Sequence, residues 1–252
     1  MLLRVLVLGG TSQASELARA LNDRPVVEAT LSLAGRTSAP AAYALPTRIG
    51  GFGGAAGLAA YLRAHEVDAL IDATHPFAAR ISANAVGAAR EARVPLAVLS
   101  RPPWRPGPGD RWREVADVGA AAEALGETPL RVFLTVGRLQ AGAFRAAPQH
   151  WYLVRSIDPP DALPPRAQVL RARPPFSLAE EIVLMRAHRI DALVSKNAGG
   201  EAARAKLEAA RALGIPVVMI APPPPSEGEA LADVDAALRW IEAQGQLRGV
   251  SR

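Results

Sequence analysis

The stretch Val5-Leu6-Val7-Leu8-Gly9-Gly10-Thr11-Ser12 decides the fold, because it predicts a buried strand, a glycine turn and the start of a helix. Leu17 and Leu21 continue the helical spacing, and Thr11 or Ser12 supplies the N-cap. Glycines let a backbone approach a diphosphate closely, and the free N–H groups of a helix N-terminus favour an anion. We therefore interpret Gly9, Gly10, Thr11 and Ser12 as a phosphate-binding loop. A tight turn without a ligand is the alternative, since the full G-x-G-x-x-G pattern is missing.

The tip of the second expected strand selects the nucleotide. This strand, residues 28–33, runs into Ala34-Gly35-Arg36-Thr37-Ser38. Sites that prefer NAD place Asp or Glu there to bind the ribose 2′-hydroxyl. The guanidinium of Arg36 and the hydroxyls of Thr37 and Ser38 instead suit a 2′-phosphate, and no acidic residue occurs between Ala29 and Ala64. The two segments together predict a site for NADPH.

Composition excludes several classes of protein. The chain has 252 residues, half of them apolar, so it can bury a sizeable core. It has no cysteine, which excludes disulfides, thiolate catalysis and cysteine-ligated metal centres. The four histidines lack ligand spacing, so we expect no metal. The apolar runs are too short to cross a membrane and no signal-peptide pattern begins the sequence, so we expect a cytoplasmic protein without a membrane partner. The oligomeric state is not predicted.

The positive charge comes almost wholly from arginine. The formal net charge is +5, and the only lysines among the 29 basic residues are Lys196 and Lys206. The basic residues form no run with interleaved aromatic residues, so we do not expect a nucleic-acid partner. A positive field around a cleft would instead concentrate an acidic small molecule.

Apolar runs alternate with alanine-rich helical stretches along the whole chain, which is typical of α/β folds with mostly parallel sheets. The elements are too many for one mononucleotide-binding half. We therefore predict two Rossmann-like or flavodoxin-like lobes that divide near Gly126–Leu130. Residues 1–128 would form the NADPH-binding domain, and residues 129–252 would complete a substrate cleft between the lobes.

The motif Asp72-Ala73-Thr74-His75-Pro76-Phe77 follows a buried strand, with Pro76 suited to the first helical position. Ligands bind at the carboxyl edge of parallel sheets, so we expect Thr74 and His75 to face the cofactor or the substrate. Capping of the turn by Asp72 is the alternative, and one group can do both. His75 could also donate a proton to a reduced product.

Ser195-Lys196-Asn197-Ala198-Gly199-Gly200 is the corresponding segment of the second lobe. A lysine at a strand tip, in a chain that otherwise uses arginine, suggests a compact charge or a tunable pKa. The alternative is an Asn197 N-cap beside a solvated lysine. Gly137-Arg138 ends the first strand of this lobe, and Arg155 and Arg173 lie near later strand ends, where several arginines would bind carboxylates if they lined one cleft.

Several segments together resemble the precorrin-6A reductase family of cobalamin biosynthesis, and the match spans nearly the whole chain. The segments are Leu8-Gly9-Gly10-Thr11, Asp72-Ala73-Thr74-His75-Pro76-Phe77-Ala78, Arg101-Pro102-Pro103-Trp104, Ser195-Lys196-Asn197 with Gly199-Gly200, and Pro216-Val217-Val218-Met219. The chain departs from the family pattern at Pro174, where glycine is frequent, and at Ala198, where serine is frequent.

The resemblance implies an NADPH-dependent oxidoreductase that reduces one double bond of the precorrin-6A macrocycle to give precorrin-6B. The macrocycle carries many carboxylates, which agrees with an arginine-rich cleft. The implied cofactor-binding residues are Gly9, Gly10, Thr11, Ser12, Arg36, Thr37, Ser38 and Thr74. The implied substrate-binding residues are His75, Gly137, Arg138, Lys196 and Asn197, with His75, Lys196 or water as the proton donor.

The same class of α/β fold serves other functions, and three of them are alternatives for this chain. A short-chain dehydrogenase is the nearest alternative and a weak one, because no tyrosine has a lysine four residues later: Thr47, His65 and Ser156 occupy those positions. A cobalt-precorrin-6A reductase and a non-catalytic two-lobed protein that binds an anionic ligand remain alternatives.

Overall fold

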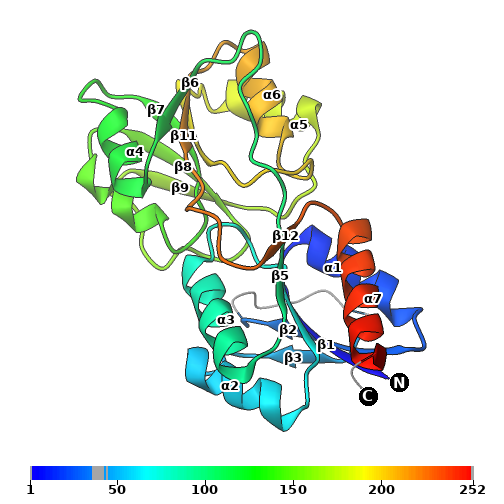
Figure 1. The fold of residues 1–252 in the computed structure, drawn as a ribbon. Coiled ribbons are helices and arrows are strands. Elements are labelled where there is room, and N and C mark those ends of the chain that lie inside the picture. Colours follow the sequence, from blue (N-terminus) through cyan, green and yellow to red (C-terminus); the bar gives the residue numbers. More distant parts are fainter. Residues whose placement is uncertain (1, 36–42, 44, 251–252) are drawn as a thin grey trace. The chain divides into compact units, whose positions relative to one another are not determined.

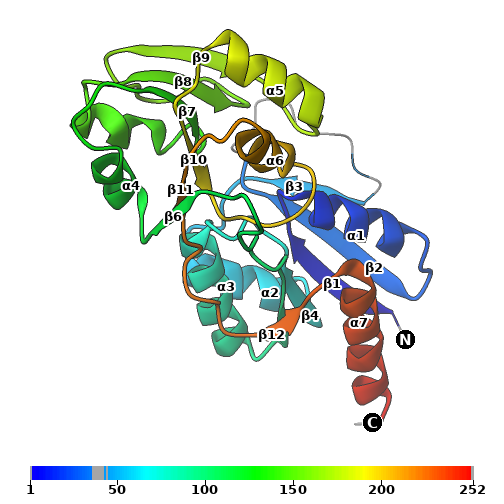
Figure 2. The same cartoon turned by 90° about the horizontal axis from the view of Figure 1, so that it is seen from above.

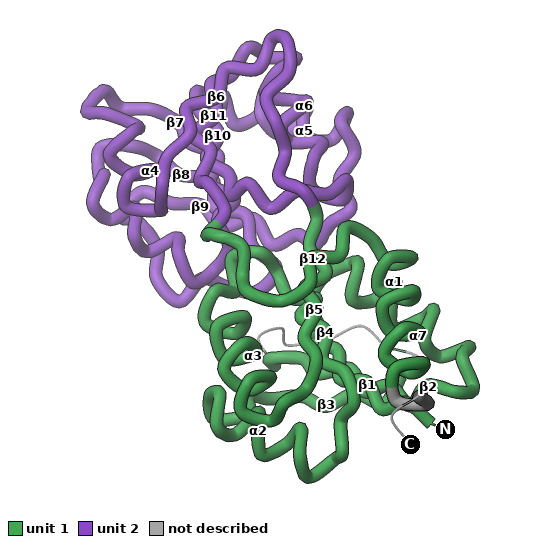
Figure 3. Tube along the Cα trace, in the orientation of Figure 1, with its two compact units in different colours: residues 1–101, 223–252 green, residues 102–222 purple. Residues whose placement is uncertain are grey.

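The computed structural model describes residues 2–35, 43 and 45–250, and the chain forms two compact units within this range. Unit 1 contains residues 1–101 and 223–252, and unit 2 contains residues 102–222 (Figure 3). Both are α/β units built on a sheet of six parallel strands, so the predicted fold class is confirmed. No helix in the described ranges is long and apolar enough to cross a membrane.

The sheet of unit 1 has the strand order β12-β5-β4-β1-β2-β3. Its strands are β1 (Leu3–Leu8), β2 (Val27–Leu33), β3 (Thr47–Ile49), β4 (Ala69–Asp72), β5 (Leu96–Leu99) and β12 (Glu229–Leu231). Its helices are α1 (Ser12–Asn22), α2 (Ala55–Ala64), α3 (Ala79–Ala92) and α7 (Val234–Val250). Helices α1 and α7 cover one face of the sheet, and α2 and α3 cover the other (Figures 1 and 2).

Alternation along the strands explains why helices cover both faces. Val5 and Val7 pack with Trp240 and other residues of α1 and α7. Leu6 and Leu8 pack in a second cluster with residues of α2 and α3. A strand that is apolar on both sides must be covered on both sides, as is usual for parallel sheets.

Unit 2 repeats this architecture with the strand order β6-β11-β10-β7-β8-β9. Its strands are β6 (Trp112–Val115), β7 (Arg131–Thr135), β8 (Trp151–Ser156), β9 (Ala167–Arg171), β10 (Ala192–Lys196) and β11 (Val217–Ile220). Its helices are α4 (Val118–Ala124), the 3-10 helix η1 (Ala141–Ala146), α5 (Leu178–Ala187) and α6 (Ala205–Ala212). Phe133, Leu153 and Met185 belong to the core between the sheet and helices α5 and α6.

The division of the chain differs from the predicted division after residue 128. Strand β6 pairs with β11, where Trp112 faces Val217, so residues 102–128 belong to unit 2. Strand β12 pairs with β5, where Glu229 faces Ala97, and the chain after Pro222 returns to unit 1. In each sheet one edge strand thus pairs with a strand that is distant in the sequence. Local periodicity contains no information about such long-range pairing.

Candidate active site

The predicted phosphate loop connects β1 to α1 in unit 1. A Cβ at Gly9 would lie 2.6 Å from Cδ1 of the buried Leu31, so glycine lets the backbone pass here without displacing the Leu31 side chain. Gly10 has φ +125°, a conformation that L-residues rarely adopt. The Thr11 hydroxyl caps α1 by accepting from the Ala14 N–H at 3.1 Å. The first turn of α1 contains no acidic residue, so this helix N-terminus suits a phosphate.

Thr11 also connects the phosphate loop to the segment after β4. Its hydroxyl donates to the Ala73 carbonyl at 2.8 Å. The Asp72 carboxylate accepts from the Thr74 N–H at 3.0 Å and from the Thr74 hydroxyl at 2.6 Å. Asp72 therefore fixes the turn, and the Thr74 side chain is oriented by the strand end that precedes it.

His75 is exposed in this turn, and its Nδ1 accepts a hydrogen bond of 3.2 Å from the Phe77 N–H. In a neutral ring the proton then lies on Nε2. Helix α3 begins at Ala79, so Pro76 is not at its first position, contrary to the prediction. The turn extends two residues further because its backbone groups are bound by the Asp72 and His75 side chains.

A cavity of about 500 Å³ opens beside Gly9, which is a size typical of ligand sites. Its walls come from the ends of β1 and β2, the loop Gly50–Gly54, Thr74 and the start of α3. Arg48 holds the Gly50–Gly54 loop by donating to the Gly51 carbonyl at 2.8 Å, and its guanidinium lies 3.8 Å from the centroid of the Phe52 ring. Sequence reasoning missed this loop. Four glycines in five residues after a strand were the available signal.

A further missed residue, Arg101, follows β5 at the carboxyl edge of the same sheet. Its Nη1 donates to the Ser12 hydroxyl at 3.4 Å, which places a guanidinium beside the N-terminus of α1. Burial lowers the pKa of Arg101 below its ordinary value. The expected 2′-phosphate residues Arg36, Thr37 and Ser38 lie outside the described residues. Ala34, which precedes them, lines the cavity.

In unit 2, Lys196 ends β10 and is half-buried. Burial lowers its pKa to about 8. Strand β10 pairs with β7, so Gly137 and Arg138, which follow β7, lie at the same edge of the sheet as Lys196. Gly137 has φ +83° and Arg138 forms an ion pair of 3.5 Å with Asp161.

The side chains of two other polar residues of unit 2 bind other groups of the protein. Asn197 is buried. Its side-chain amide accepts a hydrogen bond of 2.7 Å from the Trp104 N–H and donates one of 2.9 Å to the Trp104 carbonyl. Arg155 is buried in an ion pair with Glu181, and its guanidinium lies 3.8 Å from the centroid of the Phe176 ring. The sequence left open that Arg155 binds substrate carboxylates, whereas the structure gives this side chain a partner in the core.

Unit 1 has the 3-2-1-4-5-6 strand order of a doubly wound nucleotide-binding sheet. In unit 2, strands β7 to β11 take the first five positions of this order, and β6, which precedes them in the chain, takes the sixth. Ligands bind to such sheets where the strand order reverses. In unit 1 that point lies between β1 and β4, and carries the Gly9 loop and Thr74. In unit 2 it lies between β7 and β10, and carries Gly137 and Lys196. Fold and site together define an enzyme built from two Rossmann-like units.

Comparison with known proteins gives the particular family. The model of the precorrin-6x reductase CbiJ/CobK family matches residues 4–242. The chain is 54% identical to the precorrin-6A reductase of Rhodococcus erythropolis over 94% of this chain and 97% of that protein. It is 49% identical to the precorrin-6A reductase of Rhodobacter capsulatus over 98% of this chain and 99% of that protein.

A solved structure of CobK precorrin-6A reductase has a TM-score of 0.92 and 49% identity, and the match covers 97% of this chain and 98% of that one. The chain therefore belongs to the precorrin-6x reductase CbiJ/CobK family, and the resemblance seen in the sequence is confirmed.

Proposed function

We propose that this protein reduces one C=C bond of precorrin-6A to give precorrin-6B, with NADPH as the reductant. The observation that carries the proposal is the Gly9–Ser12 loop, whose Gly9 lines a cavity of about 500 Å³, in a chain of this family. The relatives with 54% and 49% identity are both precorrin-6A reductases by name, which favours the cobalt-free substrate.

The residues of unit 1 fit a dinucleotide. Gly9 lets the backbone of the loop pack against Leu31, where a Cβ would clash, the N-terminus of α1 is free of acidic residues, and Arg101 adds a cation beside Ser12. We place the diphosphate at Gly9, Gly10, Thr11 and Ser12. We place the 2′-phosphate at Arg36, Thr37 and Ser38, because their side chains suit a phosphate and not a 2′-hydroxyl.

The chemistry needs a hydride and a proton added across the double bond. The nicotinamide supplies the hydride when the cofactor is bound, and the protein supplies orientation and the proton. Thr74, held by Asp72, and the exposed ring of His75 lie at the switch point of unit 1. The Lys196 ammonium is the second candidate donor, because burial lowers its pKa to about 8, and a general acid is most effective when its pKa lies near the pH of the reaction.

The substrate is a polycarboxylate, and we assign Arg138 and Lys196 to it as cations at the carboxyl edge of the second sheet. Gly137, between β7 and Arg138, leaves room for the macrocycle to approach the backbone. Asn197 acts on this site through Trp104, because its side-chain amide forms hydrogen bonds with both the N–H and the carbonyl of Trp104.

The proposal is tested by mixing the protein with NADPH and precorrin-6A and following NADPH absorbance and the product mass. We expect NADPH oxidation and a product that is heavier by two hydrogens. Parallel reactions with cobalt-precorrin-6A identify the preferred form of the substrate. Tight binding of both ligands without oxidation of NADPH would favour a binding protein and refute the proposed reaction.

A further inference from the structure

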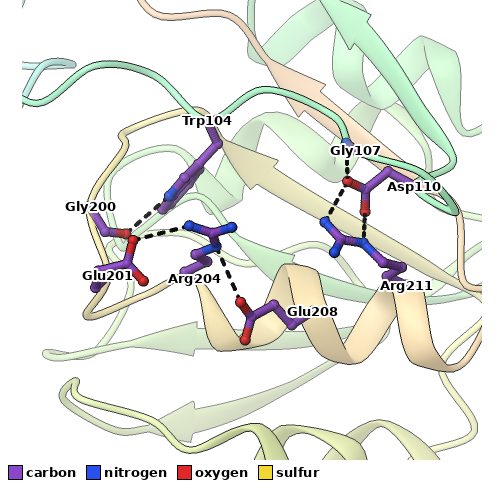
Figure 4. Close-up of polar contacts among 8 residues, drawn as sticks. All are labelled: Trp104, Gly107, Asp110, Gly200, Glu201, Arg204, Glu208 and Arg211. Atoms are coloured by element: carbon purple, nitrogen blue, oxygen red, sulfur yellow. Dashed lines mark hydrogen bonds and ion pairs between the residues drawn. The ribbon is translucent and has the colours of Figure 1, made fainter.

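Trp104 closes a clamp on the loop that follows Lys196. Its backbone N–H donates to Asn197 Oδ1 at 2.7 Å, and its carbonyl accepts from Asn197 Nδ2 at 2.9 Å. Its indole Nε1 donates to the Gly200 carbonyl at 3.0 Å (Figure 4). The three bonds hold both ends of the segment 197–200, which begins directly after Lys196.

The segment 197–200 contains no helix or strand. Gly199 and Gly200 have φ values of +67° and +79°. Glycine has no side chain that would restrict its backbone, so these residues do not fix the path of the loop themselves. Asn197 is buried, so loss of its two partners would leave a polar amide unsatisfied in the interior. The path of this loop therefore depends on groups outside it. These are the Ile220 carbonyl of β11, which accepts from the Asn197 N–H at 2.8 Å, and the three groups of Trp104.

Lys206 supports the ring of Trp104 from α6. Its side chain is buried, and its ammonium lies 5.2 Å from a ring centroid of the indole, within the range of a cation–π contact. Burial and the nearby Arg155 lower the pKa of Lys206 to about 7, while Glu181 opposes the shift. Lys196 and Lys206 are the only lysines of the chain, and both are at least half-buried at this loop.

The segment that follows Trp104 in the chain is fixed independently at Gly107 and Asp110. Asp110 accepts from the Gly107 N–H at 2.7 Å, and from Arg211 through Nε at 2.9 Å and Nη2 at 2.8 Å (Figure 4). These contacts involve the far end of α6 and do not include the loop after Lys196. Asp110 therefore provides a matched control for the Trp104 clamp.

We propose that Trp104 and Asn197 are positioning residues, whose clamp fixes the segment 197–200 and thereby holds the Lys196 amine in place for the reaction. The inference rests on the proposed function for the role of Lys196. It assigns Asn197 to the support of the site and away from direct contact with the substrate.

The kinetic test compares Asn197→Ala and Trp104→Phe with the control Asp110→Asn. Asn197→Ala removes two of the three bonds, so we expect kcat to fall roughly tenfold while the KM for NADPH stays within about twofold. Trp104→Phe removes only the bond to Gly200, so it should have a smaller effect in the same direction. Asp110→Asn should lower stability and leave kcat unchanged.

A second readout does not need turnover. Lysine labelled with ¹³C at Cε gives NMR signals from only two side chains, and Lys206→Met assigns them. In the wild type the Lys196 signal should titrate near the lowered pKa of about 8. In Asn197→Ala the loop opens, and the pKa of Lys196 should rise toward the ordinary value of about 10.4.

The proposal is overturned if neither clamp variant changes the Lys196 titration or kcat more than Asp110→Asn does. If Asn197→Ala does not fold, Trp104→Phe decides the question, since it retains both Asn197 bonds. If the wild type fails to reduce precorrin-6A while the Lys196 titration responds to the clamp, the proposed function is refuted and the clamp stands.

Discussion

Replacement of Gly57 by alanine should displace the loop that walls the cofactor cavity. Alanine in place of a helical glycine normally stabilises a protein by up to about 1 kcal/mol. In α2, however, a Cβ at Gly57 would lie 2.9 Å from the carbonyl carbon of Phe52 and closer still to its oxygen. Non-bonded carbons pack at about 3.5–4.0 Å, and the oxygen is closer than the carbon, so the Gly50–Gly54 loop must move by more than roughly 1 Å. Such overpacking costs about 1–3 kcal/mol.

The consequence for the cofactor follows from the position of Phe52. Its ring stacks on Arg48, and the loop lines the cavity beside Gly9. We expect the Kd for NADPH to rise roughly tenfold in Gly57→Ala, which corresponds to about 1.4 kcal/mol. Calorimetric titration with NADPH measures the affinity, and urea unfolding measures the stability.

Gly245→Ala is the matched control. Gly245 is also helical, in α7, but a Cβ there would meet its nearest neighbour, Leu3, at 3.9 Å, an ordinary contact. This variant should be as stable as the wild type or slightly more stable, with an unchanged Kd. If Gly57→Ala is destabilised as expected and still binds NADPH with the wild-type Kd, the cavity is not the cofactor site as we describe it.

Three further substitutions test separate parts of the account. Arg36→Ala should weaken NADPH roughly tenfold more than NADH if the guanidinium binds the 2′-phosphate, and titration with both cofactors measures the ratio; equal losses would exclude that role. If the Lys196 ammonium donates the proton, kcat should fall as the pH rises above about 8, and Lys196→Arg should lack this limb in a pH profile; an identical limb in the variant would assign it to another group. Arg155→Met should destabilise unit 2 by about 3–5 kcal/mol in urea unfolding, because Glu181 stays buried without its partner. The additional change Glu181→Leu should recover most of this loss, and a double variant no more stable than the single one would contradict the explanation.

The sequence predicted most elements of the fold because strand and helix periodicities are local. It missed β12, a strand of three residues between a proline-rich segment and α7. It also placed β6 in the wrong half of the chain, because only the pairing with β11 shows to which sheet β6 belongs. Strand β3 ends at Ile49, and glycines that follow it form part of the cavity wall.

The candidate site was predictable where a motif follows directly from backbone chemistry. The glycine turn at Gly9 and the turn fixed by Asp72 are of this kind, and both have the predicted local structure. The partners of Asn197 and Arg155 were not predictable, since Trp104 and Glu181 are distant in sequence and nothing local marks them as neighbours.

Reaction with deuterated NADPH tests the central claim most directly. The protein is mixed with precorrin-6A and NADPH that carries deuterium at the transferable position of the nicotinamide, and the product is analysed by mass spectrometry. The account predicts one deuterium in the product for each NADPH oxidised, and the other added hydrogen from solvent. Bound NADPH that is not oxidised, or a product without deuterium, would contradict it.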